Sequence, residues 1–245
     1  DSFFILGGSR SINCLDDKCW AIIKSSLSIG INNWFVHPFV PNILMVEGAR
    51  ESDVGTVAFA HSFDNLRRYL NKESVTLLIN DEVSQSKVPW DKVVSKNPQQ
   101  AFTIPEFSVP GRTNNAVDRA MRILPLLSYH KKYPLFSRAS VVLAMSIGFL
   151  LGYRNIVLCG IDLNDGLYFW EDEGFCPHPS VEVPLDSGQT RTNVHSTVNS
   201  RINKVTADAS ILSFTEHVLL PEGSRVFVTS SSSRLYPKLP LYSFL

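Results

Sequence analysis

Short apolar runs alternate along this chain with longer segments whose apolar residues recur at helical spacing. A short apolar run predicts a buried strand, and recurrence at every third or fourth position predicts an amphipathic helix. The predicted strands are Phe3–Leu6, Leu27–Phe35, Ile43–Val46, Val75–Asn80, Asn155–Gly160 and Arg225–Thr229. A first predicted helix begins near Ser11, and the others span Thr56–Leu70, Asn115–Tyr129, Arg138–Leu151 and Ser196–Leu219.

This alternation predicts an α/β fold, a Rossmann-like and mostly parallel sheet with helices on both faces. Sheets of this kind bind ligands at the carboxyl ends of their strands, near the point where the strand order reverses. Two turns that follow predicted strands are therefore candidate ligand sites. They run from Gly7 to Ser11 and from Gly160 through Ile161 to Asp162.

Two stretches interrupt the alternation. Residues 81–112 carry four prolines and are predicted to be irregular. Residues 163–195 mix glycine, proline, acidic and aromatic residues without a clear period. A loop of this length within a compact domain is usually functional or disordered, and the aromatic residues argue against disorder. We therefore expect a small lid subdomain at 163–195, over a main α/β domain formed by residues 1–162 and 196–245.

The composition is that of a globular protein, with 44% hydrophobic and 19% charged residues. Lys and Arg together number 23, as do Asp and Glu, so the charge gives no reason to expect nucleic-acid binding. The longest apolar run, Ala139–Leu151, is shorter than the roughly 20 residues that span a bilayer, and it predicts a buried core helix. Peripheral association with a membrane through another segment stays open.

The four cysteines are too sparse for a disulfide framework and favour a reducing compartment. Cys159 lies in an apolar run and is expected to be buried. A zinc site built from Cys14, Cys19, Cys176 and His178 matches no common spacing of zinc ligands and is disfavoured.

The first turn has the sequence Gly7-Gly8-Ser9-Arg10-Ser11. Its glycines would let the backbone approach a phosphate, and the helix after it would offer free N–H groups. The turn lacks the Gly-x-Gly-x-x-Gly pattern of dinucleotide-binding folds. A serine hydrolase built on Ser9 is also disfavoured, because Ser11 stands where the nucleophile elbow has its last glycine. A purely structural strand-to-helix turn remains an alternative.

Two side chains at predicted helix starts are candidates for chemistry. Ser140 falls in the first turn of its helix, where its hydroxyl would meet a phosphate, although helix capping is the interpretation that the pattern favours. His195 precedes the helix predicted from Ser196, and a lone histidine there is by default a surface or capping residue. A helix N-terminus disfavours a charged imidazole, which would keep His195 neutral and able to accept a proton.

Motifs spread over nearly the whole chain occur in the order found in one enzyme family. They are Gly7-Gly8-Ser9-Arg10-Ser11-Ile12, Asn33, Ser140, Leu151-Gly152-Tyr153, Gly160-Ile161-Asp162 and His195-Ser196. In this ordered set the chain resembles the bacterial CMP-sialic-acid-dependent sialyltransferases of glycosyltransferase family 42. The resemblance implies a nucleotide-binding main domain and an inverting transfer of sialic acid, or a related nonulosonate, from a CMP-sugar to a glycan hydroxyl.

The resemblance also implies roles for single residues. His195 would be the general base, and Tyr168 would hydrogen-bond the departing phosphate. The other implied contacts with the CMP-sugar are made by Gly7, Gly8, Ser9, Asn33, Ser140, Gly160, Ile161, Asp162 and Asn164. Arg138 and Arg191 are candidates for binding a sugar carboxylate, although surface arginines are the simpler interpretation of both.

The partners and the setting follow from the same resemblance. It implies no metal and no cofactor, since the CMP-sugar is itself the donor substrate. It implies a homo-oligomer that works on a CMP-sugar and a glycan acceptor in bacterial lipooligosaccharide biosynthesis. The implied location is the cytoplasm, at the inner face of the membrane.

Four positions depart from the motifs of that family. Gly8 replaces an Asn, Glu47 stands where a second Asn is expected, Val141 replaces a Gly, and Asn164 replaces one of two lid tyrosines. These departures leave two alternatives open. One is a CMP-Kdo-type transferase on the same fold, and the other is a non-catalytic nucleotide- or glycan-binding protein.

Overall fold

A computed structural model describes residues 1–47, 56–80, 90, 101–164, 167–185, 195–201 and 203–244. Within these residues seven parallel strands form one sheet in the order β5-β4-β3-β2-β1-β8-β9, which confirms the predicted α/β fold. The strands are β1 (Ser2–Leu6), β2 (Leu27–Ile31), β3 (Ile43–Glu47), β4 (Thr76–Asn80), β5 (Ala101–Thr103), β8 (Asn155–Cys159) and β9 (Arg225–Val228). A separate parallel pair joins β6 (Phe107–Ser108) to β7 (Leu135–Phe136).

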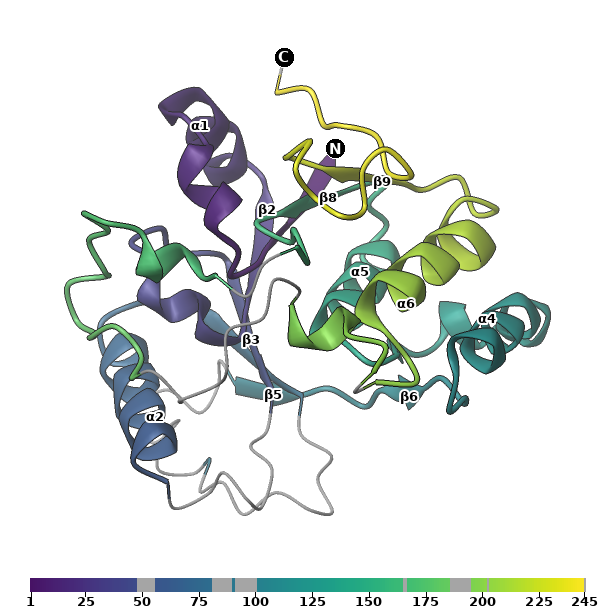
Figure 1. The fold of residues 1–245 in the computed structure, drawn as a ribbon, viewed down its shortest axis with the longest axis horizontal. Coiled ribbons are helices and arrows are strands. Elements are labelled where there is room, and N and C mark those ends of the chain that lie inside the picture. The colour runs from purple at the N-terminus through teal and green to yellow at the C-terminus, as the bar shows by residue number, and fades with distance from the viewer. Residues whose placement is uncertain are drawn as a thin grey trace.

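Helices cover both faces of the sheet (Figure 1). One face carries α1 (Asp17–Lys24) and α2 (Val57–Leu70), and the other carries α4 (Asn114–Ile123), α5 (Ser140–Leu150) and α6 (Ala207–Phe214). Because successive residues of a strand point to opposite faces of the sheet, adjacent side chains of β1 pack into the hydrophobic cores on its two faces in turn. Phe3 and Ile5 pack with α5 and α6, whereas Phe4 and Leu6 pack with α2.

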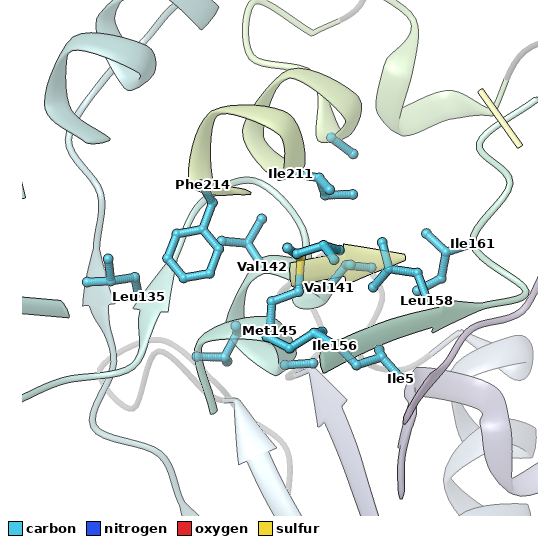
Figure 2. Close-up of a cluster of buried hydrophobic side chains, with 14 of the residues drawn as sticks. Ile5, Leu135, Val141, Val142, Met145, Ile156, Leu158, Ile161, Ile211 and Phe214 are labelled. Atoms are coloured by element: carbon cyan, nitrogen blue, oxygen red, sulfur yellow. The ribbon is translucent and has the colours of Figure 1, made fainter. Parts of the chain in front are cut away.

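The helix α5 is buried along most of its length. All residues from Ser140 to Gly148 are buried, and Figure 2 shows its side chains meeting those of α6 and β8. This burial explains the long apolar run in the sequence as core, as predicted. Among the described residues, no helix has the length and apolar character needed to cross a membrane.

The strand order reverses between β1 and β8. From β1 the chain builds outward through β2, β3 and β4 to β5, and it later returns to place β8 on the other side of β1. The turns after β1 and β8 therefore lie side by side at the carboxyl edge of the sheet, where the two candidate turns were predicted. In open α/β sheets this is the position of the ligand-binding crevice.

Three predicted elements were wrong in extent. The strand predicted to reach Phe35 ends at Ile31, because Asn32 adopts a left-handed backbone (φ 55°) and starts the 3-10 helix η2 (Asn32–Val36). The helix predicted over Asn115–Tyr129 ends at Ile123, since Pro125 cannot supply an N–H to continue it. Part of the stretch predicted to be irregular forms β5 and β6, and residues 81–89 and 91–100 lie outside the described residues.

The single helix predicted over Ser196–Leu219 was also wrong. The structure has a short 3-10 helix, η7 (Ser196–Val198), then α6, then a π-helical turn, η8 (Thr215–Leu219). The start of α6 is set by a distant partner, because the side chain of Asn114 accepts a hydrogen bond from the Thr206 amide at 2.8 Å.

The contact between α5 and β1 predicts the effect of one substitution. A Cβ at Gly148 would lie 2.4 Å from Cδ1 of Phe3. Gly148→Ala should therefore lower the free energy of unfolding by about 1–2 kcal/mol, even though Ala favours helices by about 1 kcal/mol over Gly. Chemical denaturation measures this loss.

A double variant isolates the cause. In a Phe3→Leu background the added cost of Gly148→Ala should shrink by about 1 kcal/mol, since the ring that it meets has gone. Stabilisation by Gly148→Ala alone would contradict this packing.

Candidate functional site

The two turns at the carboxyl edge are joined through their backbones. The Gly7 amide donates to the Cys159 carbonyl at 2.8 Å, and the Ser9 amide donates to the Gly160 carbonyl at 2.8 Å. A Cβ at Gly7 would lie 2.6 Å from the Gly160 oxygen, and Gly160 has a φ of 63°. Only glycines allow this approach, so the glycines flagged in the sequence are needed to bring the turns together.

Asp162 ties the same turns together through its side chain. Its buried carboxylate accepts from the Ser11 hydroxyl at 2.7 Å and from the Ser11 amide at 3.4 Å. Its own amide donates to Ser9 Oγ at 3.1 Å. Ile161, which lies between Gly160 and Asp162 in the second turn, is buried in the core and contacts Gly7. The sequence marked Asp162 as a ligand but missed Ser11 as its partner, because the two are 151 residues apart.

Tyr168 lies over the first turn. The amide after it, on Phe169, donates to the Gly8 carbonyl at 2.9 Å, and a Cβ at Gly8 would lie 3.0 Å from the Tyr168 ring. That ring stacks on Trp170 with centroids 4.4 Å apart. Partial desolvation, reinforced by the charge of Glu171, raises the pKa of Tyr168, so its phenol stays protonated and can donate a hydrogen bond at neutral pH.

His195 stands beside Tyr168. The two rings meet nearly at right angles (84°), with centroids 6.3 Å apart. The His195 amide donates to the Asn164 carbonyl at 3.1 Å, and Nδ1 lies 2.8 Å from Thr197 Oγ1 and 3.3 Å from the Thr197 amide. The structure thus brings together a histidine and a tyrosine that are 27 positions apart in the sequence.

The long helix expected to begin at Ser196 was wrong. His195 is instead the N-cap of η7, which has only three residues, so the dipole of the helix that it caps is small. The contacts with Thr197 orient the ring instead. Sequence reasoning missed Thr197, although a polar residue two positions after a capping residue is the usual partner in such turns.

A second polar cluster lies at the ends of β2 and β3. The Ser140 hydroxyl donates to Glu47 Oε1 at 2.5 Å, and the Asn32 amide group donates to Ser140 Oγ at 3.3 Å. The Glu47 amide in turn donates to Asn32 Oδ1 at 3.4 Å. Ala139, not Ser140, is the N-cap of α5, so the capping interpretation of Ser140 was wrong. Asn32 was missed, since its neighbour Asn33 had been singled out.

Asn33 lines a cavity of about 220 Å³ next to this cluster. The walls are formed by Asn32, Asn33, Phe35, Val46, Glu47, Phe59, Ser62, Phe63, Leu66 and Trp90. Four of these are aromatic. Of the polar ones, Asn32, Asn33 and Glu47 lie at the sheet edge, and Ser62 lies on α2. Apolar walls with a few polar groups are typical of sites for small organic ligands.

Other candidate side chains hold the site together. Arg138 donates to the side chain of Asn203, which donates to the Ser196 carbonyl at 2.6 Å, so Arg138 supports the turn that carries His195. The side chain of Asn164 donates to the Ser232 carbonyl. Arg191 lies outside the described residues.

The first part of the expected lid packs against the main domain. Residues 167–185 lie beside α2 and η2 (Figure 1), and Phe169 and Val181 are buried in the core on that face. The His178 amide donates to the Val36 carbonyl at 2.8 Å. Residues 186–194 lie outside the described residues. The role of the segment as a lid stays a prediction.

The cysteines and metal-binding side chains are scattered. Cys159 is buried, as expected, and all four cysteines are free thiols. Within the ranges that the structure describes, no three His, Cys, Asp or Glu side chains gather in a way that could hold a metal ion.

Two solved structures share this architecture. One is the sialyltransferase CstII from Campylobacter jejuni in complex with a substrate analogue, cytidine-5'-monophosphate; it is 12% identical over 100% of this chain and 86% of that chain, with a TM-score of 0.51. The other is the sialyltransferase CST-II in complex with a trisaccharide acceptor and CMP, 12% identical over 100% of this chain and 87% of that chain, with a TM-score of 0.52. No protein-family model and no curated protein matches the sequence. At this identity the likeness shows a shared fold.

The bond between Ser11 and Asp162 predicts a coupled loss of stability. Asp162→Ala should lower the free energy of unfolding by about 2 kcal/mol and Ser11→Ala by about 1 kcal/mol. The double variant should lose about 1 kcal/mol less than the sum, because the two side chains bond to each other. Urea denaturation of the three variants measures the coupling.

The exposed Asp17 provides the control, and Asp17→Ala should stay within about 0.5 kcal/mol of the wild type. Fully additive losses at Ser11 and Asp162 would mean that their contact does not hold the two turns together.

Proposed function

We propose that this protein is an inverting glycosyltransferase that moves sialic acid, or a related nonulosonate, from a CMP-sugar to a glycan hydroxyl, with His195 as the general base. The observation that carries the proposal is the meeting of Tyr168 and His195 beside Gly8, at the strand-order reversal where such folds bind ligands. The shared fold of sialyltransferases with bound CMP supports the same choice of nucleotide.

His195 can serve as base in one of its two neutral tautomers. The capping bond, in which Nδ1 accepts from the Thr197 amide at 3.3 Å, places the proton on Nε2. The base form is the other neutral tautomer, in which that capping bond is given up, Nδ1–H donates to Thr197 Oγ1 across the 2.8 Å contact, and Nε2 holds the lone pair. Nε2 then takes the proton of the acceptor hydroxyl as that oxygen attacks the anomeric carbon. The bond from the anomeric carbon to the phosphate oxygen breaks in the same displacement, CMP leaves, and the configuration inverts.

The leaving phosphate needs hydrogen-bond donors where its charge develops. Tyr168 supplies a protonated phenol. The amides of Gly7 and Ser9 already donate to Cys159 and Gly160, so we assign the amide of Gly8 to the phosphate. We assign the pyrimidine and ribose to Asn33 and the turn at Gly160, with the aromatic cavity beside Asn33 as the pocket for the donor.

Kinetics of CMP release test the base. With CMP-sialic acid and a panel of glycan acceptors, His195→Ala should lower kcat by at least roughly 100-fold, since a positioned general base contributes that much. Tyr168→Phe keeps the stacking on Trp170 but removes the phenol, and it should lower kcat by about 10- to 100-fold.

His61→Ala is the matched control, because His61 lies on α2 and pairs with Glu182, away from the turn of His195. It should keep the wild-type kcat. Full transfer by His195→Ala would refute the base assignment.

Two alternatives are a nucleotide- or glycan-binding protein without transfer and a CMP-Kdo-type transferase. The observation that supports both is the position of Glu47, whose carboxylate accepts a hydrogen bond from Ser140 at the N-terminus of α5. The N-terminus of a helix favours a negative charge, and at α5 the carboxylate of Glu47 already occupies that place. A phosphate or a sugar carboxylate placed beside Glu47 would meet a like charge.

Removal of that charge tests this effect of Glu47, and assays of CMP release separate the candidates. Glu47→Gln should tighten CMP binding by about five- to tenfold in calorimetry, since a like charge at a few ångströms costs about 1 kcal/mol in a solvated site. The exposed Glu216 gives the control variant Glu216→Gln, which should bind CMP as the wild type does. CMP binding without release from either CMP-sialic acid or CMP-Kdo would favour the binding protein.

A further inference from the structure

A row of exposed apolar side chains follows α4. The 3-10 helices η4 (Leu124–Leu127) and η5 (Tyr129–Lys131) continue the chain there. The exposed fractions are 54% for Ile123, 82% for Leu126, 57% for Leu127, 37% for Tyr129 and 44% for Tyr133. Five large apolar or aromatic residues are thus exposed within eleven positions, and the rings of Tyr129 and Tyr133 lie 6.2 Å apart. Exposed apolar residues gathered in this way are typical of interaction surfaces. We call these five residues the apolar patch.

Buried residues on both sides of Ser128 anchor the patch. Leu124 and His130 are buried beneath it, and His130 Nε2 lies 3.1 Å from Glu222 Oε1. Ser128, with a φ of 57°, reverses the chain between the two short helices. Because Leu124 and His130 anchor both sides of the turn in the core, Leu126 and Leu127 between them are left on the surface.

Basic residues flank the patch in the sequence. Residues 111–134 contain five of them (Arg112, Arg119, Arg122, Lys131 and Lys132) and one acidic residue, Asp118, although the whole chain is neutral. Asp118 pairs with Arg122 at 3.0 Å, and Glu222 pairs with Lys131 at 2.9 Å. The exposed Arg119 and Lys132 add to a positive field around the leucines.

We propose that the apolar patch docks this protein on an anionic membrane surface. Leu126 and Leu127 enter the acyl boundary, Tyr129 and Tyr133 lie at the headgroups, and the flanking Lys and Arg side chains reach the lipid phosphates. Each basic group near such a surface adds to the attraction. The excess of basic over acidic residues in this stretch favours an anionic lipid surface as the occupant, and a second copy of the chain is the alternative that the test separates.

The surface is separate from the candidate active site. In Figure 1, α4 lies on the outer side of α6, at the opposite end of the molecule from α2. The docking goes beyond the proposed function and needs no catalysis, so its test succeeds or fails independently of the transferase assignment.

Co-sedimentation with vesicles tests the docking. The 245-residue chain should bind phosphatidylcholine vesicles that contain phosphatidylglycerol, and bind pure phosphatidylcholine vesicles several-fold less. The double variant Leu126→Ser/Leu127→Ser should lower the partition coefficient by at least roughly tenfold, because two leucines lose their burial in lipid. Lys132→Glu should weaken binding only to the anionic vesicles, and high salt should act in the same direction.

Val57→Ser is the matched control, since Val57 is 76% exposed on α2, away from the patch. It should bind vesicles as the wild type does. Because all the substituted side chains are exposed, thermal unfolding should be unchanged throughout. Absence of wild-type binding to anionic vesicles at low salt would overturn the proposal. So would a self-association in light scattering that Leu126→Ser/Leu127→Ser abolishes without any effect on vesicle binding, because the patch would then join two copies of the chain.

Discussion

The candidate site depends on one close approach between backbones. Gly7 and Gly160 lie so near each other that any side chain on Gly7 would overlap the opposite carbonyl. This contact joins the turns on the two sides of the strand-order reversal. Ser9, Ser11 and Asp162 can then bond across the junction, and Tyr168 can pair its backbone with the first turn. The remaining polar groups are arranged around this fixed centre.

The periodicity of the sequence predicted those features whose causes are local. The apolar runs in β1, β3, β4, β8 and β9 form strands of nearly the predicted length. Both candidate turns were located because they follow the carboxyl ends of predicted strands. The failures have distant causes. Apolar residues resume at Trp34 and Phe35 after Asn32 and Asn33, so the pattern predicted a strand that continues past Ile31. These residues are buried from a 3-10 helix instead, and so short a segment has no periodicity that would distinguish the two.

The candidate site shows the same division. Glycines, Tyr168 and His195 carry recognisable chemistry, so a pattern could single them out. Asn32, Ser11 and Thr197 matter through their partners, and two of those partners lie more than 100 positions away. The start of α6 depends likewise on Asn114, 92 residues earlier. A single sequence contains no local signal for such pairings, because the fold alone creates them.

The burial of α5 has a consequence for how this protein can change. Ser140 is 5% exposed at the first turn of a helix that is buried from Ser140 to Gly148, so most substitutions there would disturb the core. Its partner Glu47 is exposed at the end of a strand and can be replaced at little structural cost. The two partners of this hydrogen bond therefore differ in mutational tolerance: Glu47 tolerates substitution and Ser140 does not. New ligand preferences on this scaffold are most accessible through the strand ends, while the helix beneath them stays fixed.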